Sequence, residues 1–115
     1  MKSPAAQASP YLGEFELLVL LAILRLEDDA YGVTIRDAIA RDTSREVTLG
    51  AIYKTLARLE DKRYVAAHLG DPTPQRGGRR KKLYRLEPPG QKALRQSVAD
   101  LRRLSRGLGH ALEAW

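Results

Sequence analysis

The spacing of apolar residues in the first half of the chain predicts helices. Residues 13–26 are apolar on nearly every side, which is typical of a helix covered all round. One small domain hardly provides such cover, so a second subunit or a central place in a monomeric core explains this segment equally well. Residues 31–42 place Ile35, Ala38 and Ile39 at the spacing of an inward helical stripe.

A third helix is expected from an N-cap at Thr48 to Lys62. One face carries the apolar side chains Leu49, Ile52, Leu56 and Leu59. The other face is smaller and basic, with Ala51, Lys54, Thr55, Arg58 and Lys62. Two short helices joined by a tight turn, the second with a basic outer face, predict a helix-turn-helix.

The period then changes, and residues 64–69 and 82–86 are short enough to be strands. Residues 70–81 between them are rich in turn formers and positive charge, so the stretch predicts a β-hairpin with a long tip, a wing. After Pro88 and Pro89 a last helix is expected from near Gly90 to the C-terminus. It carries a heptad-like apolar seam with Leu94, Val98, Leu101, Ser105, Leu108 and Leu112.

These elements predict a mostly helical α+β fold, a winged helix-turn-helix with a C-terminal dimerisation helix. The length of 115 residues allows one domain of ordinary size. We divide it into a flexible N-terminal arm at 1–11, the winged helix-turn-helix at 12–87 and the C-terminal helix at 88–115.

Charge is distributed unevenly along the chain. Residues 1–47 hold 5 basic and 8 acidic side chains, a balance of −3, and the remainder holds 15 basic and 6 acidic ones, a balance of +9. This asymmetry indicates a polyanionic partner for the second part.

The densest chemistry is a run of six cations within ten residues, Arg76, Arg79, Arg80, Lys81, Lys82 and Arg85. Such a run in isolation is usually a solvated loop, but this one occupies a hairpin tip directly after a helix-turn-helix pattern. DNA phosphate neutralises such charge, and the glycines in the tip allow close backbone approach. The wing residues predicted to contact DNA are Arg76, Gly77, Gly78, Arg79, Arg80, Lys81 and Lys82.

The third helix supplies a second set of candidate DNA contacts, Thr48, Gly50, Ala51, Tyr53, Lys54 and Arg58. Tyr53 either offers its hydroxyl to a phosphate or packs in the core. Arg58 and Lys62 either face DNA or pair with the nearby acids Glu60 and Asp61.

Other function classes fit poorly. Cysteine is absent and His68 and His110 lie far apart, so a Cys/His metal or catalytic site has too few ligands, and we expect no enzyme, metal or cofactor. The longest apolar run, residues 17–24, is too short to span a bilayer, which needs about 18–20 residues, and a cytoplasmic protein is expected. RNA binding is the nearer alternative, but it generally requires exposed aromatic residues that stack on bases. Aromatic residues make up 6% of this chain, and the predicted wing has none before Tyr84. A winged helix used only for protein contact would leave the charge of the wing without a role.

The ordered set of Tyr31-Gly32, residues 50–53, residues 56–60, residues 78–86 and Gly90 resembles the PadR family of bacterial transcriptional regulators. The resemblance covers residues 12–93 and is closest to short-tailed members with a single C-terminal helix. It implies a repressor of nearby genes that binds double-stranded DNA and is relieved in several members by a small hydrophobic effector, here expected between subunits. It also implies a homodimer in which the C-terminal helix packs on the first helix of the partner. The residues expected at that interface are Leu17, Leu21, Leu24, Leu94, Val98, Leu101, Leu108 and Leu112.

Overall fold

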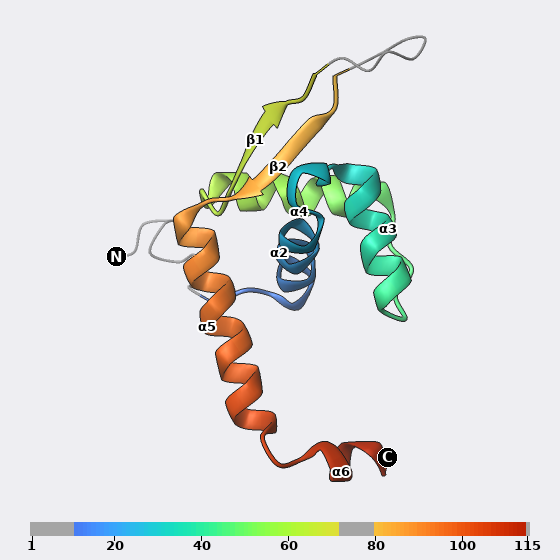
Figure 1. Ribbon diagram of the computed structural model, residues 1–115, viewed down its shortest axis with the longest axis vertical. Helices are drawn as coiled ribbons and strands as arrows, with labels where there is room; N and C mark the ends of the chain where they lie inside the picture. The colour runs from blue at the N-terminus through green and yellow to red at the C-terminus, as the bar shows by residue number, and fades with distance from the viewer. Residues whose placement is uncertain (1–10, 72–79, 115) are drawn as a thin grey trace, which may run out of the picture.

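The computed structural model describes residues 11–71 and 80–114, which form a winged helix-turn-helix followed by a C-terminal helix (Figure 1). The mostly helical α+β fold expected from the sequence is confirmed. In chain order the elements are α2 (Glu14–Leu26), η1 (Glu27–Asp29), α3 (Gly32–Asp42), α4 (Leu49–Asp61), β1 (Val65–Leu69), β2 (Lys82–Leu86), α5 (Pro88–Ser105) and α6 (Gly109–Glu113).

Helix α2 lies in the middle of the molecule and is the support for every other large element. It packs against α3, α4, β2 and α5, and Figure 1 shows it surrounded by them. Val19, Leu20 and Ile23 are at most 2% exposed. Leu21 and Leu24, on the remaining side, are 38% and 55% exposed, so the chain covers most but not all of this apolar helix.

Helices α3 and α4 form the helix-turn-helix, and their inward stripes are those expected from the sequence. Ile35, Ala38 and Ile39 of α3 are buried, as are the α4 residues Ile52, Leu56 and Leu59. The N-cap prediction for α4 is confirmed, because Thr48 Oγ1 accepts a hydrogen bond of 3.1 Å from the Ala51 N–H.

The expected exposure of Thr55 is wrong. This side chain is 2% exposed, because position 55 falls within the buried stripe of α4, between Ile52 and Leu59. The hydroxyl group conceals from a hydropathy pattern a position that helical geometry places inside.

The strands β1 and β2 pair antiparallel from Val65 opposite Leu86 to Leu69 opposite Lys82, as the hairpin prediction requires. The far edge of β2 is also used, since the Tyr84 N–H donates to the Ala30 carbonyl oxygen at 2.8 Å. Backbone hydrogen bonds therefore fix the wing to the segment that begins α3. The tip at 72–79, with the predicted DNA contacts Arg76, Gly77, Gly78 and Arg79, lies outside the described residues.

The last helix begins close to Gly90, as the sequence predicts, but it does not continue to the C-terminus. Helix α5 begins at Pro88, because proline suits the first helical positions, where its fixed φ fits and no N–H is needed. It ends at Ser105, and Gly107 adopts a φ of 79°, a left-handed conformation that stops a helix. Leu108 and Leu112 are thereby separated from the α5 part of the predicted seam.

Gly90 lies where α5 approaches the backbone that follows α4. A Cβ at this position would overlap with the Tyr64 carbonyl oxygen, and the Glu87 N–H donates to the same oxygen at 2.9 Å. A side chain here would push α5 away from the core.

We expect Gly90→Ala to lower the free energy of unfolding by about 1–3 kcal/mol through overpacking. A loss of stability would be informative, because replacing glycine by alanine within a helix otherwise raises the free energy of unfolding by about 1 kcal/mol. Gly109→Ala is the matched control, since a Cβ there meets nothing within 4 Å. Urea unfolding of both variants measures the difference, and equal stability of the two would contradict this packing argument.

Candidate nucleic-acid interface

The predicted recognition residues lie on one accessible part of α4 and its N-cap. Thr48, Gly50, Ala51, Tyr53, Lys54 and Arg58 are all exposed. Accessibility of the N-terminal half of this helix is what contact with a major groove requires. Contact with DNA itself stays a prediction for each of these residues.

The sequence left two alternatives for Tyr53, which were packing in the core and contact of its hydroxyl with a phosphate. In the structure the side chain is partly packed and partly accessible. It is 49% exposed, yet its ring covers the start of α3 so closely that a Cβ on Gly32 would overlap with the phenol end of the ring. Gly32 thus permits Tyr53 to hold α4 against α3 while part of the ring remains accessible.

The base of the wing is joined to the same surface by lysine–tyrosine contacts. Lys81 Nζ lies 4.5 Å from the centroid of the Tyr31 ring and donates a hydrogen bond to its hydroxyl oxygen at 3.3 Å. Arg80, Lys81 and Lys82 are all exposed. Tyr31, which the sequence offered only as part of a motif, therefore connects the wing with the N-terminus of α3.

Lys82 makes a second connection, this time to α4. Its Nζ lies 3.6 Å from Glu60 Oε1 and 5.6 Å from the centroid of the Tyr84 ring. Electrostatic interaction with Tyr84 and Glu60 raises the pKa of Lys82 above its ordinary value. Glu60 thus pairs with the wing and with neither Arg58 nor Lys62.

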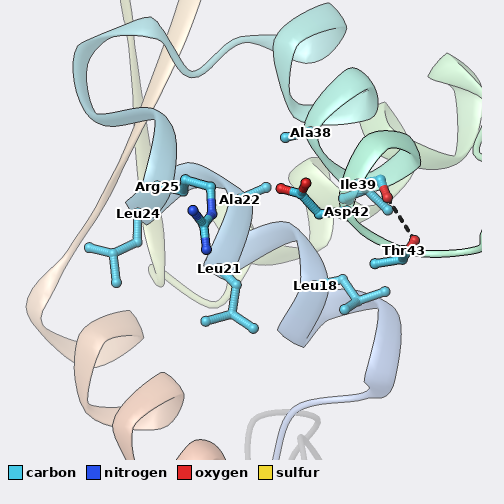
Figure 2. A pocket seen from close by; sticks show the side chains of 9 residues that line it. All are labelled: Leu18, Leu21, Ala22, Leu24, Arg25, Ala38, Ile39, Asp42 and Thr43. Carbon is cyan, nitrogen blue, oxygen red and sulfur yellow. Dashed lines mark hydrogen bonds between the residues drawn. The ribbon is translucent and has the colours of Figure 1, made fainter.

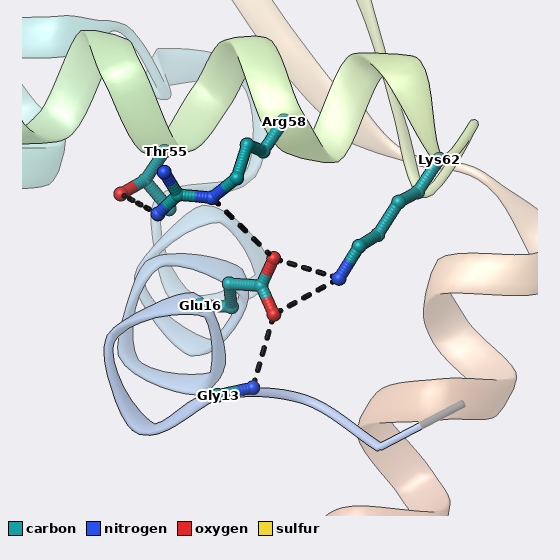
Figure 3. A network of polar contacts seen from close by, with 5 residues as sticks. All are labelled: Gly13, Glu16, Thr55, Arg58 and Lys62. Atoms are coloured by element: carbon teal, nitrogen blue, oxygen red, sulfur yellow. Dashed lines mark hydrogen bonds and ion pairs between the residues drawn. The ribbon is translucent and has the colours of Figure 1, made fainter. Parts of the chain in front are cut away.

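Arg58 and Lys62 instead pair with Glu16 on α2 (Figure 3). Lys62 Nζ lies 2.8 and 3.1 Å from the two carboxylate oxygens, and Arg58 Nε lies 4.0 Å from one of them. Placing Lys62 on the outward basic face was therefore wrong, because its long stem reaches back toward α2. The sequence contained a signal for this pairing. Position 16 belongs to the buried stripe of Val19, Leu20 and Ile23, and a buried acid requires a cationic partner.

The fold and the family follow from comparison with known proteins. The model of the transcriptional regulator PadR-like family matches residues 20–96, which includes all of α3, α4 and both strands. The chain belongs to the PadR-like family of transcriptional regulators. Regulators of this family bind DNA, so the resemblance inferred from the sequence is confirmed. The family and its solved structures are transcription regulators and not enzymes.

Solved PadR structures share the architecture of this chain. A PadR family transcription regulator from Clostridium difficile R20291 is 23% identical, with 87% of this chain and 99% of that one covered and a TM-score of 0.71. A PadR-like regulator from Bacillus cereus is 20% identical, with 85% and 90% covered and a TM-score of 0.70. A PadR family regulator from Eggerthella lenta is 26% identical, with 86% and 83% covered and a TM-score of 0.63. No curated protein matches the chain.

The apolar residues predicted for a PadR-type dimer differ in how far this chain already covers them. Leu94 is 5% exposed in the chain's own core, and Leu17 and Val98 are half-buried. The exposed members are Leu21, Leu24, Leu101, Leu108 and Leu112. None of the helices in the described ranges is both long and apolar enough to cross a membrane.

Leu21 and Leu24 form a ridge between two apolar grooves on this PadR domain. One groove lies between α2 and α3 and is also lined by Leu18, Ile39, Arg25 and Asp42 (Figure 2). The other lies between α2 and α5 and is lined by Leu21, Leu24, Leu86, Leu94 and Val98, with Arg95 and Arg102 among its polar residues. Leu21 and Leu24 are the large apolar residues of α2 that the described chain leaves exposed.

Glu16 remains charged despite its burial. Burial acts to raise its pKa, but hydrogen bonds from Lys62 and from the Gly13 N–H, together with the charges of Lys62 and Arg58, outweigh this effect. The pKa of Glu16 is therefore lowered from its ordinary value of 4.5. The carboxylate is held more strongly in the folded than in the unfolded chain.

This depressed pKa has a consequence for stability. The charged carboxylate of Glu16 adds to the free energy of unfolding. This stabilisation is complete at pH values above the ordinary pKa of 4.5 and is lost as the pH falls through the lower pKa of the folded state. At pH 7 we expect Glu16→Gln to lower the free energy of unfolding by about 1–3 kcal/mol, the range for hydrogen bonds to charged groups. Urea unfolding across a pH series checks this: the two proteins converge on acidification, whereas a gap independent of pH would contradict it.

Proposed function

We propose that this chain is a homodimeric repressor of PadR type that binds a specific DNA sequence in the cytoplasm. The N-terminal half of α4 enters the major groove, and the wing grips the adjacent backbone or minor groove. The observation that carries this proposal is the connected surface of α4, the start of α3 and the base of the wing. Tyr31 and Tyr53 join its parts.

The distribution of charge on this surface supports duplex DNA as the partner. Lys54 on α4 and Arg80 at the base of the wing are exposed and have no carboxylate partner within the described ranges. Cations without a carboxylate partner attract a phosphate backbone, and binding to it releases condensed counterions. Figure 1 shows the hairpin rising above α4 and away from α5, so the C-terminal helix leaves this surface open.

RNA binding is the nearer alternative, and two tyrosines of this surface bear on it. Tyr53 packs on Gly32 and Tyr31 binds Lys81, so each ring uses part of its surface within the protein and is less suited to act as a stacking platform for unpaired bases. A protein-binding winged helix without DNA contact would require no unpaired cations on α4. Duplex DNA therefore fits this surface better than either alternative.

The double variant Lys54→Ala/Arg80→Ala removes one cation from α4 and one from the wing. We expect weaker binding to duplex DNA and a log–log salt dependence flattened by roughly 0.9 for each lost phosphate contact. Fluorescence anisotropy with a random duplex over a salt series measures the slope. A matched control is Arg36→Ala/Arg41→Ala, whose arginines on α3 pair with Asp37 and Asp42. An unchanged slope in the first variant would remove both residues from the interface.

Exposed leucines at the C-terminus support the homodimer. Every described residue from 101 onward is exposed, although the segment contains the end of α5 and all of α6. Its leucines are 46–82% exposed at positions 101, 104, 108 and 112. The Leu21–Leu24 ridge of a second copy offers apolar surface to cover them. A two-fold dimer would then bind half-sites about 10 bp or a multiple of 10 bp apart.

We expect Leu101→Glu to weaken dimer formation, because it places a charge within the apolar contact. Leu69→Glu is the control, since Leu69 is 61% exposed on β1 and Leu101 is 55% exposed on α5. Sedimentation velocity at micromolar concentration distinguishes them: wild type and Leu69→Glu sediment as dimers, and Leu101→Glu shifts toward monomer. A wild-type protein that is a stable monomer would contradict the dimer.

The groove between α2 and α5 supports the small hydrophobic effector that the family resemblance suggested. Its apolar lining borders the Leu21–Leu24 ridge, so a bound molecule would contact the dimer surface. Such a ligand would act by population shift, favouring a dimer whose two α4 helices have the wrong separation for DNA.

A further inference from the structure

The two buried polar side chains among the described residues, Glu16 and Thr55, meet at one arginine of α4. Arg58 Nη2 donates to Thr55 Oγ1 at 3.3 Å, and Arg58 Nε lies 4.0 Å from the Glu16 carboxylate (Figure 3). Lys62 approaches the same carboxylate from the end of α4. An acid of α2 thus holds two cations of the proposed recognition helix.

The strength of this arrangement comes from burial. Glu16 is 7% exposed and its carboxylate accepts hydrogen bonds from Lys62 Nζ and from the Gly13 N–H, the latter at 3.0 Å. The Lys62 side chain is 22% exposed, so its pair with Glu16 is screened little by salt and a distant phosphate does not easily separate it. Arg58 is 53% exposed and lies at 4.0 Å, so Glu16 holds it less firmly. The exposed pairs Lys82–Glu60 and Arg85–Glu87 lack this protection.

We propose that Glu16 masks the charge of Lys62, and in part that of Arg58, and so limits how strongly α4 holds DNA of any sequence. This inference rests on the proposed binding of duplex DNA by α4. The masked cations belong to the C-terminal half of α4, whereas Lys54 in the N-terminal half is free of carboxylates within the described ranges. Phosphate binding is thereby concentrated where the helix is proposed to meet base edges.

Masking acts on the part of binding that does not depend on sequence. Contacts with phosphates strengthen binding to the operator and to random DNA alike, so they raise affinity without discrimination. A regulator must find its site among a large excess of competing sequence, and weaker binding to that excess shortens the time it spends bound away from its site. An internal carboxylate that withholds two cations lowers the sequence-independent part of binding and leaves contacts with bases unchanged.

Glu16→Gln tests the proposal, because glutamine keeps an oxygen that accepts from the Gly13 N–H and loses only the charge. Binding of a random duplex, followed by fluorescence anisotropy over a salt series, should become steeper by roughly 0.9 log–log units for each freed cation that reaches a phosphate. Affinity for random duplex at moderate salt should rise several-fold, on the order of 3–10-fold. Affinity for an operator selected from random sequence should rise by a similar factor, because contacts with phosphates do not discriminate between sequences.

Asp61→Asn is the matched control. It changes the net charge by the same amount on α4 itself, but Asp61 is exposed and has no ion-pair partner within the described ranges. An increase in slope confined to Glu16→Gln therefore reports freed cations and excludes a general effect of net charge. Equal slopes in the two variants, or a loss of affinity in Glu16→Gln with the slope unchanged, would overturn the masking role.

Lys62→Gln, alone and combined with Glu16→Gln, completes a double-mutant cycle. In the wild-type background it should leave the salt slope unchanged, since Lys62 is already neutralised, whereas in Glu16→Gln it should remove about one unit of the gain. Should Glu16→Gln fail to fold, the single variant still decides, because a slope flattened by Lys62→Gln alone would overturn masking. If the wild-type protein ignores duplex DNA even in dilute salt, it is the proposed function that fails.

Discussion

The structure depends on the need to cover one helix that is apolar nearly all round. Exposed apolar surface costs about 25 cal/mol per Å², so α2 is stable only where other elements pack against it. Helices α3, α4 and α5 and strand β2 each take one side. The helix-turn-helix, the wing and the C-terminal helix are consequently fixed to a common support, and their relative positions follow from the shape of α2.

The side that remains uncovered has a direct consequence for assembly. Leu21 and Leu24 project from α2 between two grooves, and the leucines beyond position 100 find no cover in the described part of their own chain. In the proposed dimer, the same helix that supports α4 would also offer the surface for the second subunit. A molecule that altered this proposed contact would also act on α2, and through α2 on the position of α4. Helix α2 alone is therefore enough to connect the proposed effector groove with the proposed DNA surface.

Much of this fold could be predicted from local pattern, because apolar spacing directly reports which face of an element is buried. The stripe of Ile35, Ala38 and Ile39, the cap at Thr48 and the two strands were all accessible in this way. Pattern failed at Thr55, where a polar residue occupies a buried position. Gly107 and Gly109 indicated weak final turns in the last helix, but not the left-handed turn at Gly107 that ends α5. The cap and the break are equally local, but a single glycine has several structural uses, and its φ is decided by the surrounding chain.

The pairing of charges was the part that sequence could not supply, because it depends on residues far apart in the chain. Glu16 and Lys62 are 46 positions apart, and Lys81 and Tyr31 are 50 apart. Neighbours in sequence were the natural guess for Arg58 and Lys62, yet Glu60 turns to the wing and Glu16 comes from another helix. The excess of acid in the first part of the chain is thus in part an internal counter-charge for the basic second part. Summed charge overstates what the surface offers to DNA, since exposed pairs exchange readily with phosphate while the shielded Glu16 pair resists exchange. The effective DNA-binding charge of this regulator is set by where its carboxylates are buried as much as by how many lysines and arginines it has.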